Sequence, residues 1–178
     1  MSDVREATLT ETPMGLIPEG EGWFVANARD VSWIRSAERG QDAVFEGKQD
    51  WRQIGFRIHV LAPGQVNGLY HRESGQDDFL VLSGECILIL DGEERLLRQW
   101  DFVHCPPWTE HIFVGAGDGP CVVAMAGNRA GGFEVVYPVN EVAAKHGASA
   151  LEETTQPSEA YARFGEEEHV AYEKGWLP

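Results

Sequence analysis

Short apolar runs, each broken by glycine or proline, dominate the middle of the chain. Between residues 51 and 137 these runs are rich in Val, Ile, Leu and Phe, which favour β-strands. The pattern predicts strands at 54–62, 68–72, 78–83, 86–91, 93–98, 101–105, 111–116, 121–127 and 133–138. Asp91-Gly92, between two apolar runs, is the strongest hairpin signal. Many short strands at close spacing are typical of a β-sandwich or a barrel.

The two ends of the chain have a different character. Residues 1–22 are polar and rich in glycine and proline, which predicts an extended arm, followed by short strands at 23–28, 30–34 and 43–47. After Pro138 two short helices are expected. The first spans 139–147, with Asn140 as N-cap and Gly147 as the stop, and the second spans 157–165. The aromatic residues near the C-terminus are expected to pack back on the barrel or on a partner subunit.

These segments predict a single domain over residues 1–178. It comprises an N-terminal arm at 1–50, a β-barrel at 51–138 and a helical or irregular extension at 139–178. A chain of 178 residues is long enough to bury a core without disulfides or a structural metal.

Charge and cysteine content narrow the function classes. The chain has 14 Lys and Arg against 29 Asp and Glu, a formal net charge of −15, which argues against nucleic acid and anionic membrane surfaces as partners. The three cysteines include no CxxC pair, so neither a disulfide framework nor a Cys-rich zinc site is expected. The start of the chain has no apolar signal region, and the longest apolar run is too short to span a bilayer. These features predict a cytoplasmic protein.

Two polar clusters interrupt the apolar pattern. His71 and Glu73 are two residues apart on a predicted strand, so their side chains share a face. A turn at 74–75 begins a new strand, and an antiparallel return would bring Asp77 beside them. In the second cluster a rigid Pro-Pro turn leads to His111, with Phe113 on the same face of the next strand. The sequence therefore predicts that imidazoles and carboxylates lie close together, a combination suited to metal binding or acid–base chemistry.

With these clusters the sequence resembles the cupin superfamily. The first motif of the family, G(x)5HxH(x)3–4E(x)6G, corresponds to Gly64, His71, Glu73, Asp77 and Gly84, with six residues between Gly64 and His71. The second, G(x)5PxG(x)2H(x)3N, keeps its spacing over Trp100, Pro106, Trp108, His111 and Gly115. The resemblance covers about residues 51–127. It implies an all-β fold, the double-stranded β-helix of cupin or jelly-roll barrels, which is often dimeric.

The resemblance also implies one divalent metal ion in the barrel. The positions of the usual three histidines and one glutamate are occupied here by His71, Glu73, Asp77 and His111. Two imidazoles and two carboxylates suit Mn(II), Fe(II), Ni(II) or Zn(II) without selecting among them. Without metal, Glu73 and Asp77 would crowd each other, one pKa would rise, and the pair could serve as a catalytic general base.

Each candidate also has a structural interpretation. His71 and His111 could satisfy backbone groups of the barrel, Glu73 could pair with Arg57, and Asp77 could cap a turn. The predicted ligand-binding residues carry similar alternatives. Arg57 and His59 alternate on one strand face and either line the pocket or lie at the surface. Trp108 either walls the pocket or covers the end of the barrel, and Phe113 follows His111 into the barrel. These four, namely Arg57, His59, Trp108 and Phe113, form the predicted ligand-binding set.

Three function classes are compatible with these residues. The first is a small metalloenzyme, an isomerase or an oxygenase, that acts on a small organic or sugar-like molecule. The second is a non-catalytic small-molecule binding or sensing protein with an altered metal site, and the third is a structural subunit. The substitutions at Glu73 and Asp77 favour the second class, whereas the conserved spacing of the two motifs favours the first.

We predict that the protein is a homodimer, because the segments outside the barrel carry Trp23, Trp33 and Trp176 and because open β-edges need covering. Light scattering coupled to size-exclusion chromatography should give twice the mass of the chain. A single monomeric peak at micromolar concentration would contradict this expectation.

Overall fold

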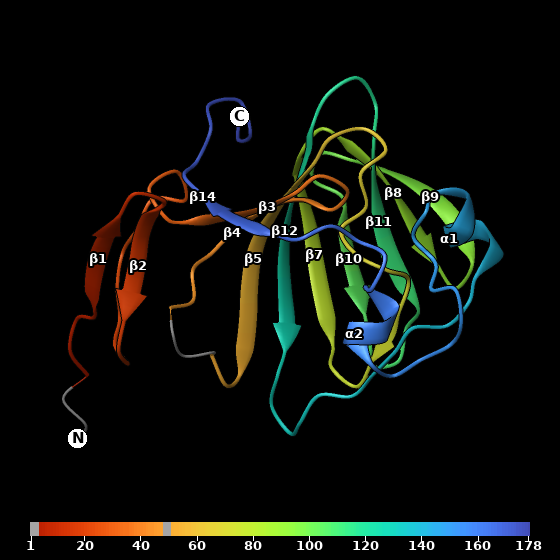
Figure 1. Cartoon of the computed structure of the whole chain (residues 1–178), viewed down its shortest axis with the longest axis horizontal. Coiled ribbons are helices and arrows are strands. Elements are labelled where there is room, and N and C mark those ends of the chain that lie inside the picture. Colours follow the sequence, from red (N-terminus) through yellow and green to blue (C-terminus); the bar gives the residue numbers. More distant parts are fainter. Residues whose placement is uncertain (1–3, 48–50) are drawn as a thin grey trace.

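Two antiparallel β-sheets face each other in the computed structural model, which describes residues 4–47 and 51–178 (Figure 1). The seven-stranded sheet has the order β10 (Phe102–Cys105), β7 (Asp77–Ser83), β12 (Cys121–Asn128), β5 (Ile54–Leu61), β4 (Gly40–Ala43), β3 (Trp33–Ser36), β14 (Glu168–Val170). The three-stranded sheet has the order β11 (His111–Ala116), β8 (Glu85–Leu90), β9 (Glu93–Arg98). Two smaller pairs are β1 (Thr8–Thr12) with β2 (Gly15–Glu19), and β6 (Arg72–Glu73) with β13 (Val135–Val136). The helices are α1 (Glu141–Lys145) and α2 (Pro157–Ala160).

The main core lies between these two sheets. Strand alternation sends Phe79 and Val81 of β7 inward, where they pack with Leu88 of β8 and Phe113 of β11. All four side chains are buried because each sheet offers its apolar face to the other. This arrangement is the expected double-stranded β-helix, and the all-β prediction is confirmed.

The predicted hairpin at Asp91-Gly92 connects β8 and β9. Leu90 pairs directly with Glu93, so the loop has two residues. Both have positive φ angles, 47° for Asp91 and 79° for Gly92, as a type I′ turn requires. Two other predicted strands are much shorter than expected: 68–72 and 133–138 retain only β6 and β13.

The N-terminal arm is more regular than predicted. Residues 8–19 form the β1–β2 hairpin, which Figure 1 places at one end of the molecule, with α1 at the other. Alternating threonines in β1 favour extended backbone, and Gly15 supplies the positive φ of the turn. Leu16 then bonds to the backbone of Asp30 and Ser32. No strand forms at 23–28. Strand β3 begins and ends later than the strand expected at 30–34, and β4 begins and ends earlier than the one expected at 43–47. Residues 48–50 lie outside the described part of the chain.

The C-terminal extension packs against the barrel, one of the two outcomes predicted for it. Trp33 is fully buried beneath Tyr172 and Trp176, whose ring centroids lie 5.8 and 5.1 Å from its own. Strand β14 was not predicted, and it extends the large sheet by pairing with β3. Helix α1 begins as expected, because the Asn140 side chain accepts hydrogen bonds from the backbone N–H groups of Val142 and Ala143. Within the described residues, neither helix is long and apolar enough to cross a bilayer.

A buried ion pair joins β4 to β5. His59 Nδ1 lies 2.6 Å from Asp42 Oδ1, and His59 Nε2 lies 2.7 Å from the carbonyl oxygen of Arg39. A carbonyl oxygen can only accept, so Nε2 carries a proton. Burial by itself raises the pKa of Asp42, but the charge and hydrogen bond of His59, with Arg57 and Arg39, outweigh burial and lower it. The carboxylate of Asp42 is therefore ionised at neutral pH and bonds to the buried ring of His59.

We predict that this pair makes stability depend on pH in acid. The pKa of Asp42 in the folded state lies below its ordinary value of 3.8, so its contribution is complete above about pH 5 and is lost as the pH falls through the folded-state pKa. Asp42→Asn should cost roughly 1.5–3 kcal/mol at pH 7, because it removes a charge-assisted hydrogen bond to the buried ring of His59. Urea unfolding from pH 7 to pH 3 measures both effects.

The matched control is Asp118→Asn, which changes an acid in the surface turn between β11 and β12. It should leave the pH profile of wild-type stability unchanged. Equal stability of Asp42→Asn and wild type at pH 7 would show that the pair contributes nothing.

Candidate functional site

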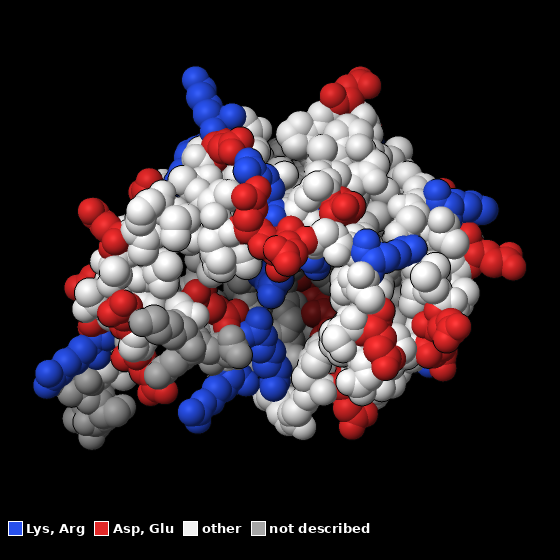
Figure 2. All heavy atoms as spheres, in the orientation of Figure 1, with Lys and Arg blue, Asp and Glu red and all other residues white. Residues whose placement is uncertain are grey.

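A cavity of about 590 Å3 opens between the sheets at one end of the barrel. Neighbouring residues on β5, β12 and β7 form cross-strand rows, and alternate rows face inward. The face drawn in Figure 2 is hollowed near its centre, where both basic and acidic atoms are visible. Two inward rows line the cavity on this sheet, Gly55–Gly127–Asp77 and Arg57–Met125–Phe79.

His71 and His111 lie together on the opposite side of the cavity. Their backbones form an antiparallel bridge, and their ring centroids are 4.7 Å apart. The Nδ1–H of His71 donates to the carbonyl of Leu69 (2.7 Å), and the Nδ1–H of His111 donates to the carbonyl of Thr109 (2.9 Å). Because a carbonyl accepts only, these bonds fix the proton on Nδ1 in both rings and leave each Nε2 to the acidic side chains.

Two carboxylates face these nitrogen atoms. Glu73 Oε2 is 3.7 Å from His71 Nε2, and Asp77 Oδ2 is 3.9 Å from His111 Nε2. The space for both acids comes from glycine. A Cβ atom on Gly75 would lie 2.9 Å from Glu73 Oε1, and one on Gly127 would lie 2.6 Å from Asp77 Oδ1. The structure thus brings together all four residues predicted from the motifs.

Burial and proximity change the acidity of this group. The pKa of Asp77 is raised to about 7. The main cause is burial, and the negative charge of Glu73 and a hydrogen bond with Glu73 add to it. Burial first, then the positive charge of His71, lower the pKa of His111 to about 4. At neutral pH His111 is therefore an unprotonated base, and Asp77 exchanges its proton readily. The raised pKa agrees with the crowding expected for two neighbouring acids.

The chemistry of these donors fits a divalent ion better than their spacing does. Imidazole nitrogens and carboxylate oxygens, two of each here, are common ligands of Mn(II), Fe(II), Ni(II) and Zn(II). Within residues 4–47 and 51–178, however, no group of three or more His, Cys, Asp or Glu side chains is close enough to hold an ion as the side chains stand. An ion would have to draw the carboxylates closer to the two Nε2 atoms.

Only one of the four predicted ligand-binding residues lines the cavity. Arg57 lines the cavity, as predicted. His59 belongs to the next inward row, where it is buried and bonded to Asp42 rather than exposed to the cavity. Phe113 is buried behind Phe79, with ring centroids 4.7 Å apart. Within the described part of the chain, the residues that line the cavity do not include His59, Phe113 or Trp108.

Trp108 instead lies half exposed at the turn before β11, and its backbone N–H donates to the carbonyl of Glu73 (2.7 Å). Its φ is 68°, and that of Trp100 is 74°. Both tryptophans stand where the family motif has glycine, and both adopt the left-handed backbone that favours glycine. The motif spacing is therefore kept by the backbone although the side chains differ.

Several cavity residues were not predicted from the sequence, among them Asn67, Met125 and Phe133. Met125 follows from the two-residue period of β12 once its register with β7 is known. Asn67 lies in an irregular segment, where its side chain accepts from the backbone N–H of Phe113 (2.8 Å). No sequence pattern indicates that position.

The C-terminal extension supports the histidine pair from behind. Tyr161, next to α2, accepts a hydrogen bond from the backbone N–H of Leu69 (3.1 Å). Leu69 in turn accepts the bond from His71 Nδ1. A residue outside both motifs thus holds the segment that orients His71.

Comparison with known proteins agrees with the architecture. Residues 57–127 match the family model of the cupin domain, whereas no curated protein matches the sequence. The polyketide cyclase RemF from Streptomyces resistomycificus is similar over 60% of this chain and 80% of its own, with 15% identity and a TM-score of 0.52. A sugar phosphate isomerase of the cupin superfamily from Silicibacter pomeroyi is similar over 61% of this chain and 66% of its own, with 21% identity and a TM-score of 0.48.

At such identities the similarity concerns the fold alone and says nothing about the reaction. The family-model match, however, covers the strands that carry the two motifs and the four converging side chains. Residues 57–127 therefore match the cupin domain in sequence, and the strands that they form have the same architecture.

Proposed function

We propose that the cavity holds one divalent metal ion and binds a small organic molecule beside it, with Glu73 and Asp77 as the proton-transferring groups. The ion would be held by His71 and His111 together with one or both carboxylates. The observation that carries the proposal is the orientation of the two imidazoles, each with Nδ1–H bonded to a backbone carbonyl and Nε2 on the side of an acid. Second-sphere bonds of this kind are typical of metal-binding histidines.

The metal ion and the side chains of the cavity have different roles in this proposal. A bound divalent ion supplies charge that polarises an oxygen atom of the ligand or acidifies bound water. In the metal-free site the pKa of Asp77 is about 7, so this acid can accept and return a proton near neutral pH. A bound cation beside Asp77 would lower that pKa. Glu73 is hydrogen-bonded to Asp77. Phe79 and Met125 keep water from one side of the acid pair.

The reaction class stays open between isomerisation and oxygenation. The isomerase and the cyclase with similar folds catalyse different reactions, so the fold does not select one. The second candidate is a binding or sensing protein without catalysis. The separations of 3.7 and 3.9 Å between acids and imidazoles favour it, because a site built for tight metal binding would hold its ligands closer.

We predict that the protein purified without chelator contains about one equivalent of a divalent metal. The apoprotein should also bind Mn(II), Ni(II) or Zn(II) in a calorimetric titration. His71→Ala combined with His111→Ala should lose at least nine tenths of the metal, because the carboxylates alone bind these ions weakly. Elemental analysis and titration measure these results.

The control is the double variant His104→Ala with His146→Ala, which removes two histidines paired with the acids Asp78 and Glu94 elsewhere on the surface. It should retain its metal. Wild-type protein that is free of metal and binds none of the three ions would reject the metal centre, and metal binding without turnover of any tested substrate would favour the sensing protein.

Tyr161→Phe should weaken metal binding about tenfold without unfolding the protein. The change removes the acceptor for the Leu69 N–H and so loosens the segment that orients His71, an effect typical of second-sphere substitutions. Tyr172→Phe removes a phenol from the separate cluster around Trp33 and serves as the control. Equal metal affinity for Tyr161→Phe and Tyr172→Phe would contradict the role of Tyr161.

A further inference from the structure

One wall of the cavity, formed by β5, carries the cation Arg57. Its guanidinium lies 3.7 Å from Asp42 Oδ2, longer than a hydrogen bond. The same carboxylate makes a 2.6 Å bond with His59 through its other oxygen atom. Asp42 is therefore shared, and its short bond is made with His59 rather than with Arg57.

The second arginine of the cavity is already engaged. Arg129 Nη1 bonds to Glu46 Oε2 at 2.6 Å, and its guanidinium lies over the space left by Gly55. It therefore forms a fixed wall rather than a free cation. Arg57, with a side chain 57% exposed, is the one of the two that can turn toward a ligand.

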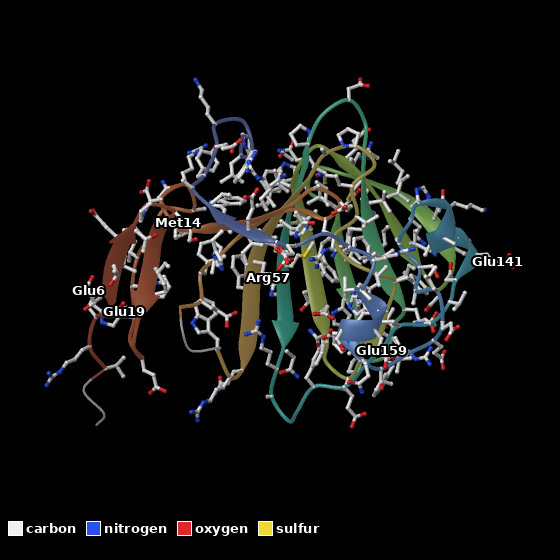
Figure 3. All side chains as sticks on the ribbon, viewed as in Figure 1. Glu6, Met14, Glu19, Arg57, Glu141 and Glu159 are labelled. Carbon is white, nitrogen blue, oxygen red and sulfur yellow. The ribbon has the colours of Figure 1, made fainter. Side chains whose placement is uncertain are left out.

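The position of Arg57 matters because the net charge of the chain is −15. Figure 3 places Arg57 near the middle of the molecule, beside β5 and β12, whereas the labelled acids Glu6, Glu19 and Glu141 lie toward its two ends. An anion that reaches the cavity thus meets a cation held away from these acids.

Apolar groups fill the distance between Arg57 and the histidines. Arg57, Met125 and Phe79 form one cross-strand row, and the ring of Phe79 packs against His111 with centroids 5.2 Å apart. Two strand spacings separate the ends of this row, roughly 10 Å. Phe133 contributes a further aromatic surface to the cavity. A cavity of about 590 Å3 is in the range that holds a small organic ligand.

We propose that the ligand is a small carboxylic acid with an apolar body of about one ring, whose carboxylate pairs with Arg57 and whose body lies along Met125 and Phe79 toward His111. This inference rests on the proposed function in that both use one cavity. A single guanidinium that makes no short bond with Asp42 matches one carboxylate better than a doubly charged phosphate, and the apolar row disfavours a sugar. The far end of such a ligand would reach the Glu73–Asp77 pair.

Three probes test the ligand class by NMR titration of the labelled protein: benzoate, the neutral isostere benzamide, and inorganic phosphate. Benzoate should bind at least tenfold more tightly than either of the others. Arg57→Gln should weaken benzoate about tenfold and leave benzamide unchanged, whereas Arg57→Lys should keep part of the affinity. The control is Arg95→Gln, because Arg95 is similarly exposed (61%) and also lies 3.7 Å from an acid, Glu93, but outside the cavity.

The proposal would be overturned if benzoate bound no more tightly than benzamide, or if it did not bind at millimolar concentration. It would also be overturned if Arg57→Gln and Arg95→Gln lost the same affinity for benzoate. Each titration is run on metal-free protein and again with Mn(II), whose own binding is measured separately. A failure of the metal centre therefore appears in the Mn(II) titration, while a failure of the ligand class appears in the benzoate series with metal-free protein.

Discussion

The two-residue period of three central strands organises both the core and the cavity. Strands β5, β12 and β7 are paired side by side, so every second row of residues points between the sheets. The row with Val123 and Val81 is core, and the next two inward rows open into the cavity. A shift of one residue in any of the three strands would bury the outer face and expel the site. Folding and site formation therefore depend on the same register.

The charges in and around the cavity depend on which inward row each titratable residue occupies. His59 is one inward row deeper than Arg57, which puts it in the core and obliges it to find a buried partner. Asp42 on β4 is that partner, and its short bond goes to His59, whereas Arg57 lies 3.7 Å from its other oxygen atom. On the other side, burial of Glu73 and Asp77 next to each other keeps one proton on the pair near neutral pH. The cavity thus has a cationic end and a proton-donating end, separated by apolar side chains.

The parts of the fold that were predicted from the sequence are those that depend on neighbouring residues. His71, Glu73 and Asp77 are linked by a short turn, and Asp91-Gly92 specifies its own hairpin, so spacing and turn chemistry suffice. Long-range partners leave no such signal. The pairing of β14 with β3 and the bond between Asp42 and His59 depend on the tertiary arrangement, and so the period that placed His59 with Arg57 could not show which of them is buried. The N-terminal hairpin was missed because its glycines and prolines indicated irregular structure, although they lie at its turn and edges.

The glycines beneath the two acids define how such a site can be gained or lost in evolution. Gly75 and Gly127 leave room for carboxylates only because each lacks a methyl group. At Gly127 an added Cβ atom meets only the Asp77 side chain, so one base change to alanine would displace that acid and leave the strands and the histidines in place. At Gly75 it would also meet the carbonyl oxygen of Asn128, at 2.6 Å, so the backbone of β12 would have to move as well. The size of a single residue at position 127 can therefore decide whether the barrel keeps its acid pair, while the fold stays the same.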